Sequence, residues 1–432
     1  MRILTERMEA HRTDSHTIDR YEATGGYTAL RKGLDMGPEA VAAEVKASNL
    51  RGRGGANFPA GVKWGFLAPA RPAYLVINAD ESEPGTFKDR QLMERDPHQL
   101  VEGVILSSYA LDVNHAFIYI RGEYPKPARR VQQAVDAAYA KGYIGENILG
   151  SGFDLEVTVH LGGGAYICGE ESALLNSLEG RRGEPRIKPP FPAVEGLYSK
   201  PTIVNNVETI SNVPWIVNNG GLAYAAIGPE TSAGTRMISL SGHVNKPGNY
   251  EIVMGMTWRD LIYDIGGGIP NGRELKAWIP GGSSAPWFVP AEHLDTPVTI
   301  DDVNSRGSMM GSGAVVVMDD TTDVVAAAHR IVRFYSHESC GQCTPCREGT
   351  TWLERIFNRI ESGQGRMVDI DLLLDVSDGI SPGLTWPPAM TTICPLGPSA
   401  TAPVISIMKY FRDEVEARIN MGIPIQVEAA DV

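Results

Sequence analysis

Short apolar runs alternate with stretches of helical periodicity over the first half of the chain. Three apolar runs are typical of buried strands: 74–78, 116–120 and 155–160. Two stretches have the periodicity of helices: 127–141 and 170–178. Because strands that alternate with helices form a sheet covered by helices, the pattern predicts a layered α/β domain over residues 1–230.

The pattern changes after residue 230. Short strand-like runs at 237–241 and 314–318 are separated by glycine turns, by Lys246-Pro247-Gly248 and by one short helical stretch near 258–265. This arrangement predicts a small α+β domain over residues 231–320.

Helical periodicity dominates the rest of the chain. Three apolar faces can be followed: Val324, Val325, Ala328, Ile331, Val332 and Tyr335; then Trp352, Leu353, Ile356, Phe357 and Ile360; then Val404, Ile405, Met408 and Phe411. The sequence therefore predicts a helical bundle over residues 321–432. Three closely spaced cysteines are expected on a loop between its first two helices.

Composition and charge exclude several classes of protein. The chain has 432 residues, of which 43% are hydrophobic and 21% charged, as in a globular protein of two or three domains. A net charge of −13 argues against nucleic-acid binding, which needs a basic face. The first residues lack the apolar segment of a signal peptide, and no apolar run has the length of a membrane span. We therefore expect a soluble protein in a reducing compartment, most simply the cytoplasm.

Cysteines gather in the last quarter of the chain. Four of the five lie there: Cys340, Cys343, Cys346 and Cys394. Three thiolates at a three-residue repeat can hold three corners of a [4Fe–4S] cluster, and a distant fourth closes it. Zinc sites more often use two separated pairs, and disulfides need an oxidising compartment. The spacing favours iron–sulfur, with zinc as the main alternative, and Cys168 is expected to be a buried small hydrophobic residue.

A glycine-rich stretch at 51–64 can approach a bulky ligand closely. Its glycines have no side chain to hold the ligand away from the backbone: Gly52, Gly54, Gly55 and Gly61. Arg53 and Lys63 supply positive charge for a phosphate. The spacing differs from the dinucleotide-binding fingerprint, and alone the stretch is also typical of a flexible surface loop.

Two more segments follow predicted strands. Residues 78–85 form an acidic loop at a strand's carboxyl end, where open α/β sheets bind ligands, although such loops are also common on solvated surfaces. Residues 162–171 contain glycines at the start of a helix, the aromatic ring of Tyr166, and Glu170 and Glu171, which also suit a first helical turn. Together with an iron–sulfur site, the three segments indicate a flavin between a two-electron donor and a one-electron acceptor.

The same segments carry a resemblance to a known family. They contain the strings GRGG (52–55), NADESEPGT (78–86), GAYICGEESALLNSLEGRRGEPR (164–186), NNVET (205–209) and ESCGQCTPCREGT (338–350). With these, the chain resembles the NADH-binding flavoprotein subunit (51 kDa, or F, subunit) of respiratory complex I from about Gly25 to Ile419. The resemblance implies an α/β Rossmann-like flavin domain, an α+β ubiquitin-like (SLBB, β-grasp) domain, and a C-terminal α-helical bundle carrying the iron–sulfur cluster.

Residue roles follow from that resemblance. FMN is expected against ten residues: Gly52, Gly54, Lys63, Asn78, Asp80, Glu81, Ser82, Gly169, Asn205 and Asn206. Glu83 is expected near the nicotinamide carboxamide of NADH, and Glu170 and Glu171 near ribose hydroxyls, so that Glu83 and Glu171 are the predicted catalytic residues. Adenine is expected on three aromatic rings, although phenylalanines are ordinarily core residues: Phe58, Phe66 and Phe191. Lys188 is expected at the dinucleotide phosphates, and the four late cysteines at a [4Fe–4S] cluster.

The chain departs from the family pattern in two places. Asn57 stands where the family usually has the last glycine of Gly-Gly-Ala-Gly-Phe, which puts cofactor affinity in question rather than the fold, because asparagine tolerates positive φ. A Pro/Gly-rich segment at 382–388 is extra material before Cys394 and can alter the surroundings of the cluster.

The resemblance implies a function and partners. The chain would oxidise NADH by hydride transfer to FMN and pass single electrons to the [4Fe–4S] cluster on the way to quinone. Its expected partners are a small [2Fe–2S] subunit and a large multi-cluster iron–sulfur subunit, which would hold it on the cytoplasmic face of the inner (plasma) membrane. Three alternatives remain open: a diaphorase subunit of an NAD-reducing hydrogenase or formate dehydrogenase, a subunit without flavin, and a zinc-stabilised binding module.

Overall fold

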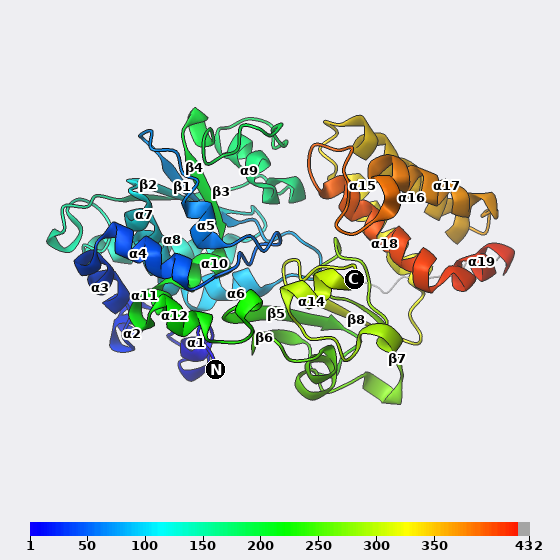
Figure 1. Ribbon diagram of the computed structural model, residues 1–432, viewed down its shortest axis with the longest axis horizontal. Coiled ribbons are helices and arrows are strands. Elements are labelled where there is room, and N and C mark those ends of the chain that lie inside the picture. Colours follow the sequence, from blue (N-terminus) through cyan, green and yellow to red (C-terminus); the bar gives the residue numbers. More distant parts are fainter. Residues whose placement is uncertain (422–432) are drawn as a thin grey trace.

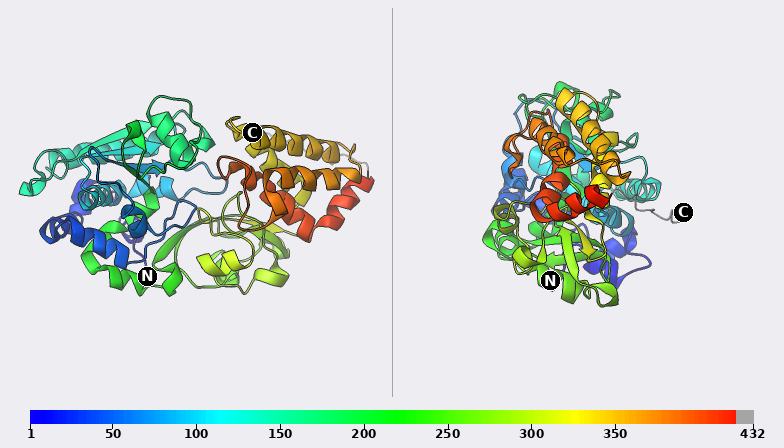
Figure 2. Two further views of the ribbon diagram at one scale, coloured as in Figure 1. Left: turned by 45° about the horizontal axis from the view of Figure 1, so that its top comes forward. Right: turned by 90° about the vertical axis from the view of Figure 1, so that its right-hand side faces the viewer.

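The structure is a computed structural model that describes residues 1–421 (Figure 1). The predicted helical domain was extended to residue 432, and its last part, 422–432, lies outside the described residues. An α/β domain and a helical bundle occupy opposite ends of the long axis, and a β-grasp domain contacts both (Figures 1 and 2). Within the described residues, none of the helices combines the length and apolar character that a membrane crossing requires.

The first domain is built on a parallel sheet with the strand order β3-β2-β1-β4. Its strands are β1 (Tyr74–Ala79), β2 (His115–Ile120), β3 (Glu156–Leu161) and β4 (Thr202–Asn206). The apolar runs of the sequence predicted the first three strands to within about one residue. β4 was not predicted, because its five residues end in two asparagines that are typical of a loop.

Helices cover this sheet. Those before α9 are α1 (Glu6–Ala10), α2 (Ile18–Ala23), α3 (Thr28–Met36), α4 (Pro38–Ala47), α5 (Ala60–Trp64), α6 (Lys88–Arg95), α7 (Pro97–Leu111) and α8 (Pro125–Ala140). The rest of the domain has α9 (Glu171–Leu178), α10 (Val207–Ser211), α11 (Val213–Asn219) and α12 (Gly221–Ala225). Almost every residue of α7 is buried, so it is the central helix of this core. α8 begins at Pro125, since proline is well tolerated in the first turn.

The second domain has a mixed sheet with the order β6-β5-β8-β7. Its strands are β5 (Thr235–Gly242), β6 (Gly248–Val253), β7 (Leu275–Ile279) and β8 (Ala314–Asp319), joined to the short helices α13 (Pro290–His293) and α14 (Ile300–Ser305). β5 and β8 are parallel, and the outer pairs are antiparallel. The predicted short helix is a π-helix over Asp260–Ile265, and Trp258, Trp278 and Phe288 fill the core beside it.

The third part is the predicted helical bundle. Its helices are α15 (Val324–Glu338), α16 (Thr344–Glu361), α17 (Val368–Ile380), α18 (Leu396–Tyr410) and α19 (Arg412–Met421). Leu353 and Phe357 on α16 are fully buried, as the apolar pattern indicates. The prediction for Trp352 is wrong: its side chain is 51% exposed, because it lies at the edge of the apolar stripe. The Pro/Gly-rich segment folds back on α17, where the Ser381 hydroxyl donates to the Ala389 carbonyl at 2.9 Å.

The start of the chain is tied to the β-grasp domain by one carboxylate. Glu251 on β6 accepts hydrogen bonds from the backbone N–H groups of Ile3, Leu4 and Thr5 at 2.7–3.1 Å. It also accepts one from the Thr235 hydroxyl at 2.6 Å. Because a charged acceptor strengthens these bonds, they fix how the first two domains sit against each other.

Candidate functional site

The glycine-rich stretch forms a tight loop at the carboxyl edge of the first sheet. The Gly52 N–H donates to the Phe58 carbonyl at 2.9 Å and closes the loop. A Cβ on Gly54 would lie 3.0 Å from the Cβ of Asn206, so this position leaves no room for a side chain. Among residues 1–421, the N–H groups of Gly54, Gly55 and Ala56 have no acceptor. These groups are available to an anionic ligand.

Two residues of this stretch do not have the roles that the sequence predicted. The Arg53 guanidinium was expected at a phosphate, but it is fully buried and donates to the carbonyls of Ala233 and Thr235, both at 2.9 Å. Gly61 was expected to admit a ligand, but its missing Cβ would lie 2.5 Å from the Cα of Lys46. It therefore allows close packing of α5 against α4.

The acidic loop after β1 contains a carboxyl group, that of Asp80, whose pKa is close to neutral pH. Burial raises the pKa of Asp80 to about 7, although a hydrogen bond from Ser82 and the charge of Arg121 oppose the shift. The bond from the Ser82 hydroxyl is 2.9 Å long. Asn78 donates to the Gly169 carbonyl at 2.8 Å and so joins this loop to the segment before α9.

The Glu81 side chain was expected beside FMN, but it points elsewhere. Its two oxygens accept from the N–H groups of Asp89 and Arg90 at 2.7 and 2.9 Å, in the first turn of α6. The Tyr124 hydroxyl donates to the same carboxylate at 3.1 Å. Burial, and then the charge of Asp89, raises the pKa of Glu81 to about 7. The Glu81 carbonyl also accepts from Arg121 Nη1, at 2.7 Å, so neither this carbonyl nor the carboxylate is free for a ligand.

Glu83 is held by the β-grasp domain. One oxygen accepts from the N–H and the hydroxyl of Ser284, both at 2.8 Å, and from the Ser283 hydroxyl at 3.1 Å. The other accepts from the Tyr166 hydroxyl at 2.7 Å. Ser283 also bonds to the Tyr335 hydroxyl of α15 at 2.8 Å, so this network joins all three domains. Sequence reasoning missed both serines, because no local signal connects them to a residue two hundred positions earlier.

Four charged side chains meet at the start of α9. Glu170 caps the helix by accepting from the N–H groups of Ser172 and Ala173. Two ion pairs lie beside this cap: Lys188 Nζ to Glu170 Oε1 at 2.5 Å, and Lys63 Nζ to Glu171 Oε2 at 2.8 Å. Burial disfavours the ionised form of Glu171, but the two lysines outweigh it and lower its pKa.

The three phenylalanines are on the surface. The exposed fractions of Phe58, Phe66 and Phe191 are 46%, 57% and 58%, and the first two ring centroids are 6.0 Å apart. The ordinary expectation of core residues is therefore wrong for these three. Exposed aromatic rings are suited to stacking on a planar ligand.

The side chains of the two asparagines at the end of β4 form hydrogen bonds within the protein. Asn205 accepts from the Trp64 indole N–H at 2.9 Å. Asn206 caps α10 with its oxygen and donates to Asp89 at 2.6 Å. Both side chains thus have partners within the protein, and Asn206 packs directly against Gly54.

The four late cysteines gather where the bundle meets the first domain. Cys340 and Cys343 precede α16, with Cys343 as its N-cap. Cys346 was expected on the loop but lies in the first turn of α16, and Cys394 precedes Pro395, the N-cap of α18. Cys346 and Cys394 belong to one hydrophobic cluster, and the partly buried Cys340 and Cys343 pack against it.

The thiols fit an iron–sulfur cluster by their chemistry. Burial raises the pKa of Cys346 to about 11 and that of Cys394 to about 12, so ligation must displace their protons. Over residues 1–421, no three metal-ligating side chains converge on a single ion. A cubane instead takes each thiolate on a different iron, so its four ligands surround a larger core. Cys168 is buried in the same hydrophobic cluster, as expected.

Three protein-family profiles match the chain. They are described as the Nuo51 FMN-binding domain over residues 45–215, the SLBB domain over residues 237–286, and the NADH-ubiquinone oxidoreductase-F iron-sulfur binding region over residues 326–418. Their order along the chain is that of the α/β domain, the β-grasp domain and the helical bundle.

Full-length relatives agree with these profiles. The F subunit of the NADH-quinone oxidoreductase of Streptomyces coelicolor is 53% identical over 409 residues, which are 94% of this chain and 89% of the relative. The F 2 subunit of the Rhizobium meliloti enzyme of the same name is 50% identical over 410 residues, 94% of this chain and 95% of the relative. A solved structure, the H2-reduced NAD+-reducing [NiFe]-hydrogenase, is 35% identical with a TM-score of 0.81. The match covers 91% of this chain but only 65% of that hydrogenase chain. The chain belongs to the family of NADH-quinone oxidoreductase F subunits.

Proposed function

We propose that this chain is the NADH-oxidising subunit of an NADH:quinone oxidoreductase, with FMN at the glycine loop and a [4Fe–4S] cluster on the four late cysteines. One observation carries the proposal. The loop with its unpaired N–H groups lies against Asn206 at the carboxyl end of β4, and the ion pair between Lys63 and Glu171 joins the segment after this loop to the start of α9. When bound, FMN takes up a hydride and releases electrons singly, and the cluster accepts single electrons.

The residues of the chain position the reactants. Lys63 and Lys188 provide positive charge for phosphate and for negative charge that develops on the flavin. Phe58, Phe66 and Phe191 stack on the adenine of NADH. Glu171 orients the dinucleotide at the ribose. The hydride transfer requires no general acid, because the hydrogen moves together with both electrons of its bond and no proton is donated in this step.

Glu83 has a second positioning role. Ser284 and Tyr166 hold its carboxylate in one orientation, at 2.8 and 2.7 Å. A carboxylate fixed in this way is a defined acceptor for the carboxamide N–H of a nicotinamide. Orientation of the nicotinamide therefore depends on the β-grasp domain.

We propose domain bounds of 1–230, 231–320 and 321–432, a division that the separate parallel sheet, mixed sheet and helical bundle of the described residues support. In the proposed assembly, a small [2Fe–2S] subunit and a large multi-cluster subunit receive the electrons. These partners would hold the chain on the cytoplasmic face of the inner (plasma) membrane. The hydrogenase similarity supports a second candidate, a diaphorase subunit, because it reaches a TM-score of 0.81. Co-purification with quinone-reducing subunits rather than with a hydrogenase subunit separates the two.

An anaerobic NADH titration tests the proposal. We expect the purified chain, reconstituted with FMN and iron–sulfur, to lose its flavin absorbance on addition of NADH. A matched variant is Phe66→Ala, which removes one exposed ring without opening the core, and it should need more NADH for the same bleaching. An unchanged flavin spectrum with the wild-type chain would contradict the proposed function.

A further inference from the structure

Asn57, the residue that departs from the family pattern, is not a loose side chain. Its φ is 55°, in the left-handed region, and its side chain is 7% exposed. Its amide nitrogen donates to the Gly55 carbonyl at 3.0 Å, inside the glycine loop. Its amide oxygen accepts from Arg236 Nη1 at 2.8 Å, across the boundary between the first two domains. The residue is therefore engaged on both sides.

Arg236 is an unusual partner. It lies on β5 of the β-grasp domain with no exposed surface, and its other hydrogen bonds go to the carbonyls of Met310 and Gly311. Among residues 1–421, its Nε has no hydrogen-bond partner. Burial, and then the nearby charge of Arg53, lowers the pKa of Arg236 to about 10. With no carboxylate bonded to it, Arg236 depends strongly on the oxygen of Asn57.

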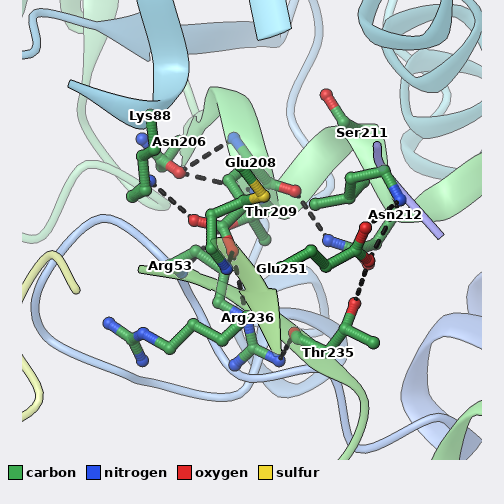
Figure 3. Close-up of polar contacts among 12 residues, drawn as sticks. Arg53, Lys88, Asn206, Glu208, Thr209, Ser211, Asn212, Thr235, Arg236 and Glu251 are labelled. Atoms are coloured by element: carbon green, nitrogen blue, oxygen red, sulfur yellow. Dashed lines mark hydrogen bonds and ion pairs between the residues drawn. The ribbon is translucent and has the colours of Figure 1, made fainter. Parts of the chain in front are cut away.

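A second arginine makes the reverse connection. Arg53 belongs to the glycine loop and donates to the carbonyls of Ala233 and Thr235, where β5 begins. Figure 3 shows Arg53, Thr235 and Arg236 close to Glu208 and Lys88, and all five residues are buried. One arginine reaches from the loop to β5, and the other from β5 to the loop. We call the contact between Asn57 and Arg236 the loop latch.

We propose that Asn57 and Arg236 are positioning residues that hold the glycine loop in the shape FMN requires, so that the β-grasp domain controls FMN affinity. The inference rests on the proposed function, which places FMN at this loop. With a glycine at position 57, only backbone contacts would stabilise the turn of the glycine loop. Here a buried charge from another domain fixes it, and the loop N–H groups keep their direction before the ligand arrives.

The variant Asn57→Gly tests the loop latch. Glycine adopts a φ of 55° without strain, so this change removes the side-chain contacts and little else. Asn271→Gly is the matched control, because Asn271 also has a positive φ, of 60°, but is exposed in the β-grasp domain. The measurement is the FMN dissociation constant of the full-length, flavin-depleted chain, from quenching of flavin fluorescence. We expect about a tenfold rise for Asn57→Gly, equivalent to about 1.4 kcal/mol, and none for Asn271→Gly.

A double-mutant cycle adds a second measurement. Arg236→Lys keeps the charge but loses the planar guanidinium, so it should also weaken FMN binding. Both substitutions break the same contact, the one between Asn57 and Arg236. The FMN dissociation constant of the double variant should therefore be about equal to that of the single variant that binds FMN more weakly. Unchanged affinity in Asn57→Gly, or losses that simply multiply, would overturn the loop latch. If the wild-type chain itself fails to bind FMN, the proposed function fails instead.

Discussion

Removal of the negative charge of Glu208 should destabilise the protein strongly. Its side chain is fully buried, and its oxygens lie 2.7 Å from Lys88 Nζ and 3.9 Å from Arg53 Nε. Glu208→Gln keeps the shape but leaves Lys88, Arg53 and Arg236 with less buried negative charge. Breaking a buried ion pair on one side costs about 3–5 kcal/mol. The α/β domain that contains Glu208 has a size at which 1 kcal/mol shifts the unfolding midpoint by about 2–4 °C, so the midpoint of this domain should fall by about 6–20 °C.

Thermal unfolding of the purified chain, followed by intrinsic fluorescence, measures this shift. Wild type and variants are compared at one scan rate, since large proteins often unfold irreversibly. Glu414→Gln is the control: Glu414 pairs with Lys276 at 2.8 Å but is 44% exposed, so its loss should cost at most about 1 kcal/mol. The reasoning is refuted if Glu208→Gln melts within about 2 °C of wild type, or no lower than the control.

Three further predictions concern the cofactor sites. Cys343→Ser should lower bound iron and abolish the paramagnetic resonance signal of the reduced cluster; a full signal would exclude Cys343 as a ligand. Lys63→Ala removes a cation from the site and leaves Glu171 without its partner at 2.8 Å. The flavin content per chain should therefore fall at least about tenfold. An unchanged flavin content would exclude Lys63 from the site. Asp80 has a pKa of about 7 in the folded protein against an ordinary 3.8, so folding binds a proton between these values and stability is lost as pH rises through that window. In the ligand-free protein, Asp80→Asn should raise the unfolding midpoint relative to wild type at pH 8 and not at pH 4; equal effects at both pH values would contradict this.

The fold was more predictable from the sequence than the site. Short continuous apolar runs predicted three of the four strands of the first sheet, and stretches of period 3.6 predicted three helices of the bundle. Directions of single side chains are set by long-range partners instead. Arg53 faces β5 rather than a phosphate because two carbonyls beyond residue 230 accept its N–H groups. Gly61 admits the backbone of Lys46 rather than a ligand. Neither the carbonyls that Arg53 contacts nor the backbone of Lys46 can be recognised from the residues that flank Arg53 or Gly61 in the sequence.

The positions of the cysteines along their helices have an electrostatic consequence. Cys343 and Cys346 lie at the start of α16, and Cys394 lies just ahead of α18. The amino-terminal end of a helix carries about half a positive elementary charge, which originates in aligned peptide dipoles. Two such ends approach the same four sulfurs, so a cluster held by them would take up an electron in a positive potential that originates in the backbone rather than in any side chain.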